Sequence, residues 1–284
     1  MNPREWQRFW KHKGAMIGVA LVLFVLLFAW MGPWFAAHDP NEQFTDLLLR
    51  RDGLPRGPGE RQGFVLGGDV LGRDELARLL HGGRVSMTVA LIATGIAVLI
   101  GMAIGITSGY FGGAYDSFVM RSVDVALSVP FLLIAIALHR VVDHPSSWTL
   151  SLLLGLLSWT TLARVVRAKT QQVCALSFIE AARALGASWT RVLLRHVLPN
   201  VVGPAVVVAT SLVAQMVIVE SAMSYLGLGV PPPQASWGSM LREGQDFMAY
   251  FPRLVLLPGA LIVLTVFGFN LLGEALRDAL DPRD

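Results

Sequence analysis

The chain has 284 residues, of which 54% are hydrophobic and 15% are charged, and its formal net charge is +3 at pH 7. This balance is typical of an integral membrane protein, because several uncharged stretches approach the roughly 20 residues that cross a bilayer core. The small positive excess is explained by basic loops between those stretches, so it gives no reason to expect nucleic-acid binding.

Six apolar stretches predict six transmembrane helices in an all-α, polytopic membrane fold. They cover about residues 15–36, 85–106, 118–138, 148–163 with its flanks, 201–219 and 254–273. The third is the least regular, since Arg121 and Asp124 fall in its first turns, three residues apart, where they could pair with each other. We treat the chain as one integral unit. Residues 1–65 hold the N-terminus, the first span and the start of an extracytoplasmic segment, and residues 66–284 form a core with the other five spans.

The basic residues around the first span predict its orientation. Four of them precede it, Arg4, Arg8, Lys11 and Lys13, whereas the fourteen residues after it, 37–50, carry only Arg50. The positive-inside rule then places the N-terminus in the cytoplasm, and six spans return the C-terminus to the same side. A cleaved signal peptide is the alternative, with Ala36-Ala37 as a possible cleavage site. Its apolar core would be only about 7–15 residues, so we expect an uncleaved anchor.

With this topology the loop at about residues 164–200 lies inside. It contains Glu180-Ala181-Ala182, then Gly186, and later Leu198-Pro199. The alanines favour a short helix, with Ile179 and Ala182 on one face, and Gly186 can supply the left-handed residue that ends it. Pro199 should end the next helical stretch, because its ring removes a backbone donor. The simpler interpretation is an ordinary capped loop helix whose arginines reach toward lipid headgroups.

This segment resembles the EAA motif of bacterial ABC-importer permeases, and other motifs resemble the dipeptide/oligopeptide/nickel branch in the same order. They are Asp69 with Leu71-Gly72-Arg73-Asp74, Gly109-Tyr110-Phe111-Gly112-Gly113, Glu220-Ser221-Ala222 with Leu226-Gly227-Leu228-Gly229, Ser236-Trp237-Gly238, and Phe269-Asn270-Leu271-Leu272-Gly273 with Leu276-Arg277-Asp278. The resemblance is nearly continuous over residues 66–283 and is greatest to the C-type subunit. Two departures are Gly68, where that subunit has threonine, and a spacing from the motif glycine to Leu-Pro that is one residue longer than the generic one.

The resemblance implies a type I ABC-importer permease fold and a non-catalytic role. Its partners would be a homologous second permease, two ATP-binding subunits that hold ATP and magnesium, an extracytoplasmic solute-binding protein, and the lipid of a bacterial inner membrane. No cofactor is expected in this chain. The implied ATPase-coupling residues are Glu180, Ala181, Ala182, Gly186, Leu198 and Pro199. The expected cargo is a dipeptide or oligopeptide, with nickel chelates or glutathione as the alternative.

Two residues near the outer side have competing interpretations. Glu220 lies at the outer end of the fifth span, where water could reach it. It is either an interfacial carboxylate that caps or pairs locally, or a residue at the mouth of the cargo path. Trp237 follows the rigid Pro231-Pro232-Pro233 and could anchor at the membrane interface. By resemblance, its loop would form an outer gate or a docking ledge for the binding protein.

Two further segments leave alternatives open. Residues 69–84 could lie along the outer membrane surface or lead directly into the second span and pack on the bundle. Gly101, Gly105 and Gly109 form a small-residue face, for contact with a partner permease or with another helix of this chain.

Other classes of protein are disfavoured. None of the three lysines, Lys11, Lys13 and Lys169, follows a glycine, so the chain has no phosphate-binding loop that ends in Gly-Lys-Ser/Thr. The histidines fall in loops or at span ends, and neither Gly-x-Ser-x-Gly nor His-Glu-x-x-His occurs. Cys174 is the only cysteine, which excludes a disulfide within the chain. A secondary carrier would need ion sites at broken helices and internal repeats. A membrane enzyme that uses Ser–Lys or carboxylate chemistry stays open.

Overall fold

The computed structural model describes residues 9–10, 13–141 and 145–280 of the chain. Arg4, Arg8 and Lys11, which carry the orientation argument, lie outside these residues. The described part is helical, and its elements are α2 (Lys13–Trp30), η1 (Gly32–Phe35), α3 (Thr45–Leu48), α4 (Glu75–Phe111), α5 (Gly113–Ser128), α6 (Phe131–Val141), α7 (Ser147–Cys174), α8 (Ser177–Ala184), α9 (Trp189–Val192), η2 (Leu193–Val197), α10 (Leu198–Tyr225), α11 (Trp237–Gly244), η3 (Gln245–Phe247) and α12 (Arg253–Leu280).

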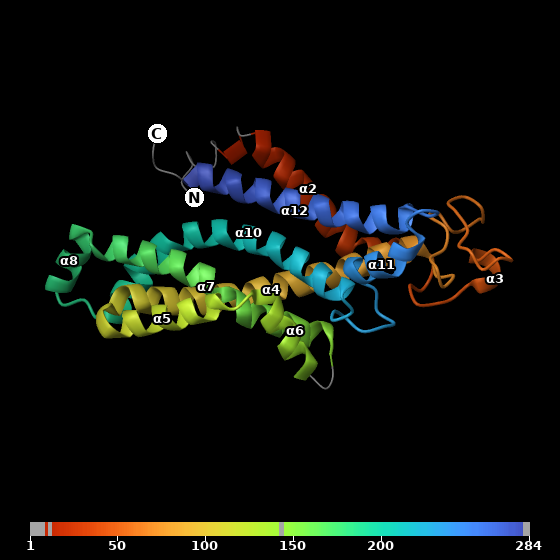
Figure 1. Cartoon of the computed structure of the whole chain (residues 1–284). Helices are drawn as coiled ribbons and strands as arrows, with labels where there is room; N and C mark the ends of the chain where they lie inside the picture. Colours follow the sequence, from red (N-terminus) through yellow and green to blue (C-terminus); the bar gives the residue numbers. More distant parts are fainter. Residues whose placement is uncertain (1–8, 11–12, 142–144, 281–284) are drawn as a thin grey trace.

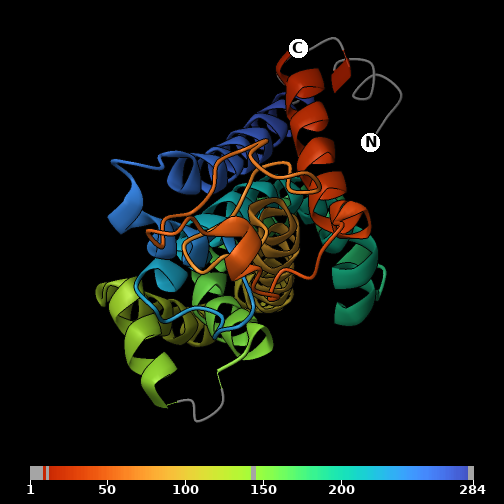
Figure 2. The ribbon, with the colours of Figure 1, turned by 90° about the vertical axis from the view of Figure 1, so that its right-hand side faces the viewer.

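The long helices run side by side along one axis. Within this bundle α4 packs along α7, and α10 packs on both α12 and α4, while α2 lies against α12. In Figure 1, α8 lies at one end of the bundle, and α3 with the loops around it lies at the other. Figure 2 looks at that second end, where the segment between α2 and α4 covers the tip of α4. We call the α8 end the inner end and the α3 end the outer end, following the predicted topology.

The prediction of six spans is confirmed, with the third span broken. Five described helices are long and apolar enough to cross a membrane, and α5 with residues 131–137 of α6 supplies a sixth if the bent pair counts as one span. The two parts meet at 81°. Pro130 follows the last turn of α5, and a residue before proline is disfavoured in helical conformation. The break therefore falls where the sequence cannot continue α5.

Small residues allow α4 and α7 to approach closely. A Cβ added to Gly105 would lie 2.7 Å from the carbonyl oxygen of Ala163, and one added to Gly101 would lie 2.9 Å from the carbonyl oxygen of Trp159. Gly109 meets Thr170 in the same way. Of the two interpretations of this glycine face, the structure supports contact within the chain.

The structure gives the helix bounds within two predicted segments. In the predicted inner loop at about 164–200, α7 continues to Cys174 and helix resumes at Trp189. For residues 69–84, the structure supports the interpretation that they lead directly into the second span and pack on the bundle, since α4 begins at Glu75 and runs without a break through that span. Asp74 caps this helix, and its side chain accepts a hydrogen bond from the backbone N–H of Leu76 at 3.0 Å.

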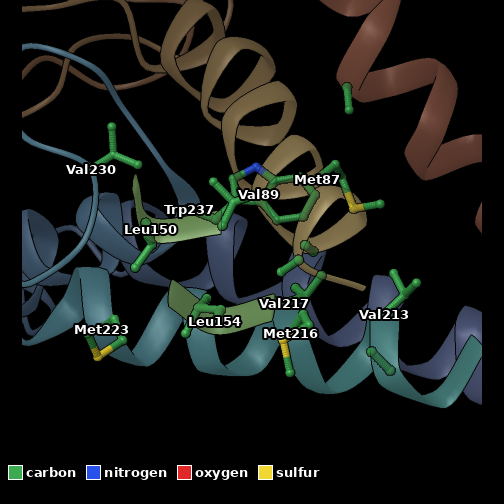
Figure 3. Packing of buried hydrophobic residues seen from close by; sticks show 14 of the residues in the cluster. Met87, Val89, Leu150, Leu154, Val213, Met216, Val217, Met223, Val230 and Trp237 are labelled. Atoms are coloured by element: carbon green, nitrogen blue, oxygen red, sulfur yellow. The ribbon is translucent and has the colours of Figure 1, made fainter. Parts of the chain in front are cut away.

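The main core fills the outer half of the bundle. Figure 3 shows Trp237 beside Met87 and Val89 of α4, with Leu154 of α7 and Met216 of α10 close by. Because α11 contributes Trp237 to this core, the short outer helix is fixed on the bundle.

Candidate functional site

The predicted handle at the inner end is a short helix with a defined stop. The helix α8 ends at Ala184, and Gly186 follows with φ +82°. The N–H of Gly186 donates to the carbonyl of Arg183 at 3.0 Å, and the N–H of Ala187 donates to that of Ala182 at 3.1 Å. This pair of bonds is the Schellman arrangement, in which a left-handed residue satisfies the last carbonyls of a helix. The prediction for Gly186 is confirmed.

One face of α8 is fixed on the bundle. Ile179 is fully buried, and it belongs to an apolar cluster with Val173 of α7 and Val197 of η2, against which Tyr110 of α4 also packs. The guanidinium of Arg183 lies over the ring of Tyr110, 4.9 Å from its centroid. The same cluster therefore joins α8 to α4, to α7 and to the start of the α10 helix. We call it the inner seat.

The other face of α8 is open. Glu180 and Ala181 are exposed, and Ala182 is half-buried, so Ile179 and Ala182 share the packed face as predicted. Leu185 has 89% of its surface exposed, although it is a large apolar side chain. We call Glu180, Ala181 and Leu185 the coupling surface. Figure 1 shows α8 at the end of the bundle.

Leu198 and Pro199 lie in the helix that follows, between Val197 and Val201 of the inner seat. The prediction that Pro199 ends this helix is wrong. Helix runs from Trp189 to Tyr225, and Pro199 stands at the start of α10. The π-helical turn η2 precedes it, and the N–H of Leu198 bonds to the carbonyl of Leu193. This wider turn changes the hydrogen-bond register next to the missing proline donor, so the chain passes through without a break.

The two predicted outer residues are both buried. Glu220 has no exposed surface, and the hydroxyl of Ser224 donates to its carboxylate at 2.8 Å. The hydroxyl of Ser221 donates at 3.5 Å, and Ser86 and Ser236 lie close to the same carboxylate. The expected local pairing of Glu220 is therefore confirmed in its bond to Ser224, whereas the expectation that water reaches its carboxylate is wrong. A buried carboxylate needs such donors, because leaving it without partners would cost several kcal/mol.

Trp237 holds α11 against α4. Its backbone N–H donates to Ser86 at 3.2 Å, and its ring Nε1–H donates to the carbonyl of Leu79 at 3.1 Å. Gly83 makes room for the ring, since a Cβ there would lie 2.7 Å from it. The side chain is fully buried, so the prediction of an interfacial anchor is wrong.

An outer ion network was not predicted. Arg78, at the start of α4, bonds to Glu243 of α11 at 3.0 Å, and Arg73 bonds both to Asp69 at 2.6 Å and to Glu243. The i,i+4 spacing of Asp69 and Arg73 was a usable signal. Glu243 lies more than 160 residues away in sequence, and no local pattern connects it to them.

Two ion pairs join α5 to α7 at the inner half. The carboxylate of Asp116 accepts two bonds from Arg167, each at 2.5 Å, and one from Ser108. The carboxylate of Asp124 accepts a bond from Arg164 at 2.5 Å. The predicted pairing of Asp124 with Arg121 is wrong, because α7 brings the guanidinium of Arg164 to that carboxylate.

Comparison with known proteins shows which families most of the chain matches. Residues 101–283 match the family described as binding-protein-dependent transport system inner membrane component, and residues 4–51 match the N-terminal TM domain of oligopeptide transport permease C. The chain is 36% identical, over 98% of its length and 91% of the relative, to the di/tripeptide transport system permease protein DppC of Pseudomonas aeruginosa strain UCBPP-PA14. It is 37% identical, over 97% of its length and 88% of the relative, to the oligopeptide transport system permease protein OppC of Bacillus subtilis strain 168.

Solved structures share the fold. A chain of the inward-facing MetNI methionine ABC transporter superposes with a TM-score of 0.54 at 17% identity, over 72% of this chain and 96% of that one. A chain of an amino acid ABC transporter gives 0.52 at 16% identity, over 71% and 94%.

Proposed function

The chain belongs to the family of binding-protein-dependent transport system inner membrane components, and we propose that within it the chain is a permease subunit of an ATP-driven peptide importer. The relatives named above are a di/tripeptide permease and an oligopeptide permease, and each aligns over nearly the whole chain. These names favour peptides over nickel chelates or glutathione as cargo. The family also sets aside the secondary carrier and the membrane enzyme.

We propose that this chain forms half of the translocation path and performs no chemistry of its own. The complete importer would contain a homologous second permease, two ATP-hydrolysing subunits that bind ATP and magnesium, and an extracytoplasmic binding protein. The chain would lie in a bacterial inner membrane with both termini in the cytoplasm. The basic residues near α8, Lys169, Arg183, Arg191 and Arg195, support an inner location for this end.

One observation carries the coupling proposal: α8 is packed on one face and open on the other. Ile179 and Arg183 fix the helix to the inner seat, whereas Glu180 and Leu185 face outward. A rigid helix fixed in this way can transmit a push from an ATPase subunit to α4, α7 and α10 together. When the ATPases close on ATP, the differential contact energy would shift the permease between inward and outward access.

The outer residues fit the same proposal. Glu220 and Trp237 join α10 and α11 to α4, and the outer ion network adds Glu243 to this contact. We propose that these contacts hold the outer gate in the conformation seen here, and that the gate opens by separating α11 from α4.

The test is a pull-down of the complex from detergent-solubilised membranes, with ATPase activity measured in the recovered material. The wild-type chain should recover a second permease and ATPase subunits. Glu180→Arg should lose the ATPases or uncouple their activity, because it reverses a charge on the coupling surface. Glu42→Arg, at an exposed position of the outer segment, is the matched control and should behave as wild type. A chain that purifies alone, with Glu180→Arg unchanged, would refute the proposal.

A further inference from the structure

The helix α5 carries an exposed polar stripe, in which Asp124 pairs with Arg164 of α7. Ser117, Arg121, Asp124 and Ser128 are all exposed, and they follow one another at intervals of four, three and four residues. These intervals place all four side chains on one face of a helix. We call this face the α5 stripe.

Two other faces of α5 have different surroundings. Asp116 and Val123 are its buried residues, and they face α4 and α7, where Asp116 pairs with Arg167. Phe118 and Val125 are apolar and exposed, with 73% and 66% of their surfaces accessible. At about 100° per residue, they lie roughly a quarter turn from the α5 stripe. The helix therefore has a packed face, a polar open face and an apolar open face.

The charged part of the stripe lies at membrane depth. Arg164 precedes the end of α7 at Cys174 by ten residues, which is about 15 Å along the helix axis. Its neighbour Ala163 contacts Gly105 of α4, which lies ten residues before the inner end of the uncharged stretch from Val85 to Tyr115. The side chains of Arg164 and Asp124 are nevertheless 47% and 53% exposed.

An ion pair at this depth is costly to expose to lipid, and charges within spans face the bundle interior or a water-filled cavity. Arginine alone could reach the headgroups with its long side chain, but aspartate is too short to do so. The α5 stripe also continues outward from Asp124 to Ser128, about 6 Å further from the inner end. The serine hydroxyls donate to their own helix, so the charges carry the argument.

We infer that the α5 stripe, together with Arg164, lines the aqueous translocation path and binds the charged ends of a peptide. This inference rests on the proposed function for its cargo. A free peptide carries an α-ammonium and an α-carboxylate. Asp124 is the complementary group for the first, while Arg164 and Arg121 are complementary to the second. In the absence of cargo, Asp124 and Arg164 neutralise each other, which is the arrangement in this structure.

Accessibility tests the first half of the inference. Cys174 is the only cysteine, so Cys174→Ser gives a background free of thiols. In that background, Ser128→Cys and Val125→Cys place a thiol at two positions three residues apart on α5, the first on the polar open face and the second on the apolar open face. In the assembled importer, a charged, membrane-impermeant thiosulfonate should label Ser128→Cys and leave Val125→Cys unlabelled. Equal labelling of the two, or no labelling at Ser128→Cys in any nucleotide state, would overturn the assignment of the path.

Transport tests the second half. The variants Asp124→Asn and Arg164→Gln should still fold and assemble with the ATPases, because an exposed ion pair contributes little to folding. Asp124→Asn should raise the KM for a free dipeptide by roughly tenfold, the loss of one charge-assisted hydrogen bond, and leave the KM for its N-acetyl form unchanged. Arg164→Gln should likewise raise the KM for the free dipeptide by roughly tenfold, and it should leave the KM for the dipeptide with a C-terminal amide unchanged.

Equal losses for free and blocked peptides would overturn the assignment of Asp124 and Arg164 to the peptide termini. Failure of the proposed function would look different. The wild-type complex would then lack ATPase subunits or would not import any of the three peptides, whereas the thiol-labelling result would still report on the path.

Discussion

The packing of α8 is most directly perturbed at Ile179, which is fully buried in the inner seat. Truncation of a buried isoleucine to alanine costs about 2–5 kcal/mol. The helix has eight residues and contacts the bundle through one face, so we expect the lower limit and expect the loss to appear as local undocking. A cost of about 2 kcal/mol multiplies the undocked population about 30-fold at 25 °C.

Hydrogen exchange in nanodiscs measures this population. Amides of residues 177–186 should exchange about 30-fold faster in Ile179→Ala, whereas those of α4 and α7 should keep their rates. Peptide-stimulated ATPase activity should fall with them, because an undocked α8 cannot transmit a movement. Leu185→Ala is the control, since this exposed side chain contributes little to docking and its removal should leave exchange unchanged. If Ile179→Ala exchanged as slowly as wild type, or if exchange rose throughout the bundle, the local-seat reasoning would be wrong.

Three further substitutions give separate tests. Gly186→Ala should destabilise the end of α8 by about 1–2 kcal/mol, because φ is +82° at this residue, and the amides of residues 177–186 should exchange faster. Gly186→Asn should destabilise it less. Equal destabilisation by the two substitutions would contradict the backbone explanation. Gly105→Ala should lower the unfolding temperature, because the added methyl group would force α4 away from α7. Gly95 has open space around it, so Gly95→Ala should leave the unfolding temperature unchanged or raise it. A larger decrease for Gly95→Ala than for Gly105→Ala would contradict the packing. Trp237→Phe should destabilise the outer end by about 1 kcal/mol, because the hydrogen bond to the carbonyl of Leu79 is lost. Hydrogen exchange in α11 measures this loss. Unchanged exchange there would show that Trp237 does not hold α11 against α4.

Local chemistry explains what the sequence predicted well. The spans were recognisable because an uncharged apolar run of about 20 residues has the length of a membrane-spanning helix and forms few other structures. Gly186 was recognisable because few other residues accept a left-handed conformation after a helix. The break before Phe131 coincides with Pro130, and the charges at Arg121 and Asp124, earlier in the same span, had already marked it as irregular.

The errors arose where distant segments decide the outcome. The burial of Glu220 depends on serines from α4 and from the start of α11, and the burial of Trp237 depends on a gap at Gly83; neither leaves a pattern in the neighbouring sequence. Asp124 pairs with Arg164 across 40 residues, although Arg121 was the closer candidate. Pro199 does remove a donor of the α-helical hydrogen bonding, as expected. The helix does not end there, because a π-helical turn precedes the proline and the helix continues.

The binding of α8 to an ATPase subunit through the coupling surface can be tested with a photoactivatable crosslinker. The crosslinker is attached to Leu185→Cys in the Cys174→Ser background of the assembled complex. We expect a crosslinked product with an ATPase subunit, and none with an ATPase from Val65→Cys, an exposed position in the outer segment. Crosslinking of Leu185→Cys to the binding protein, or to no partner in a complex that hydrolyses ATP and imports peptide, would contradict the claim.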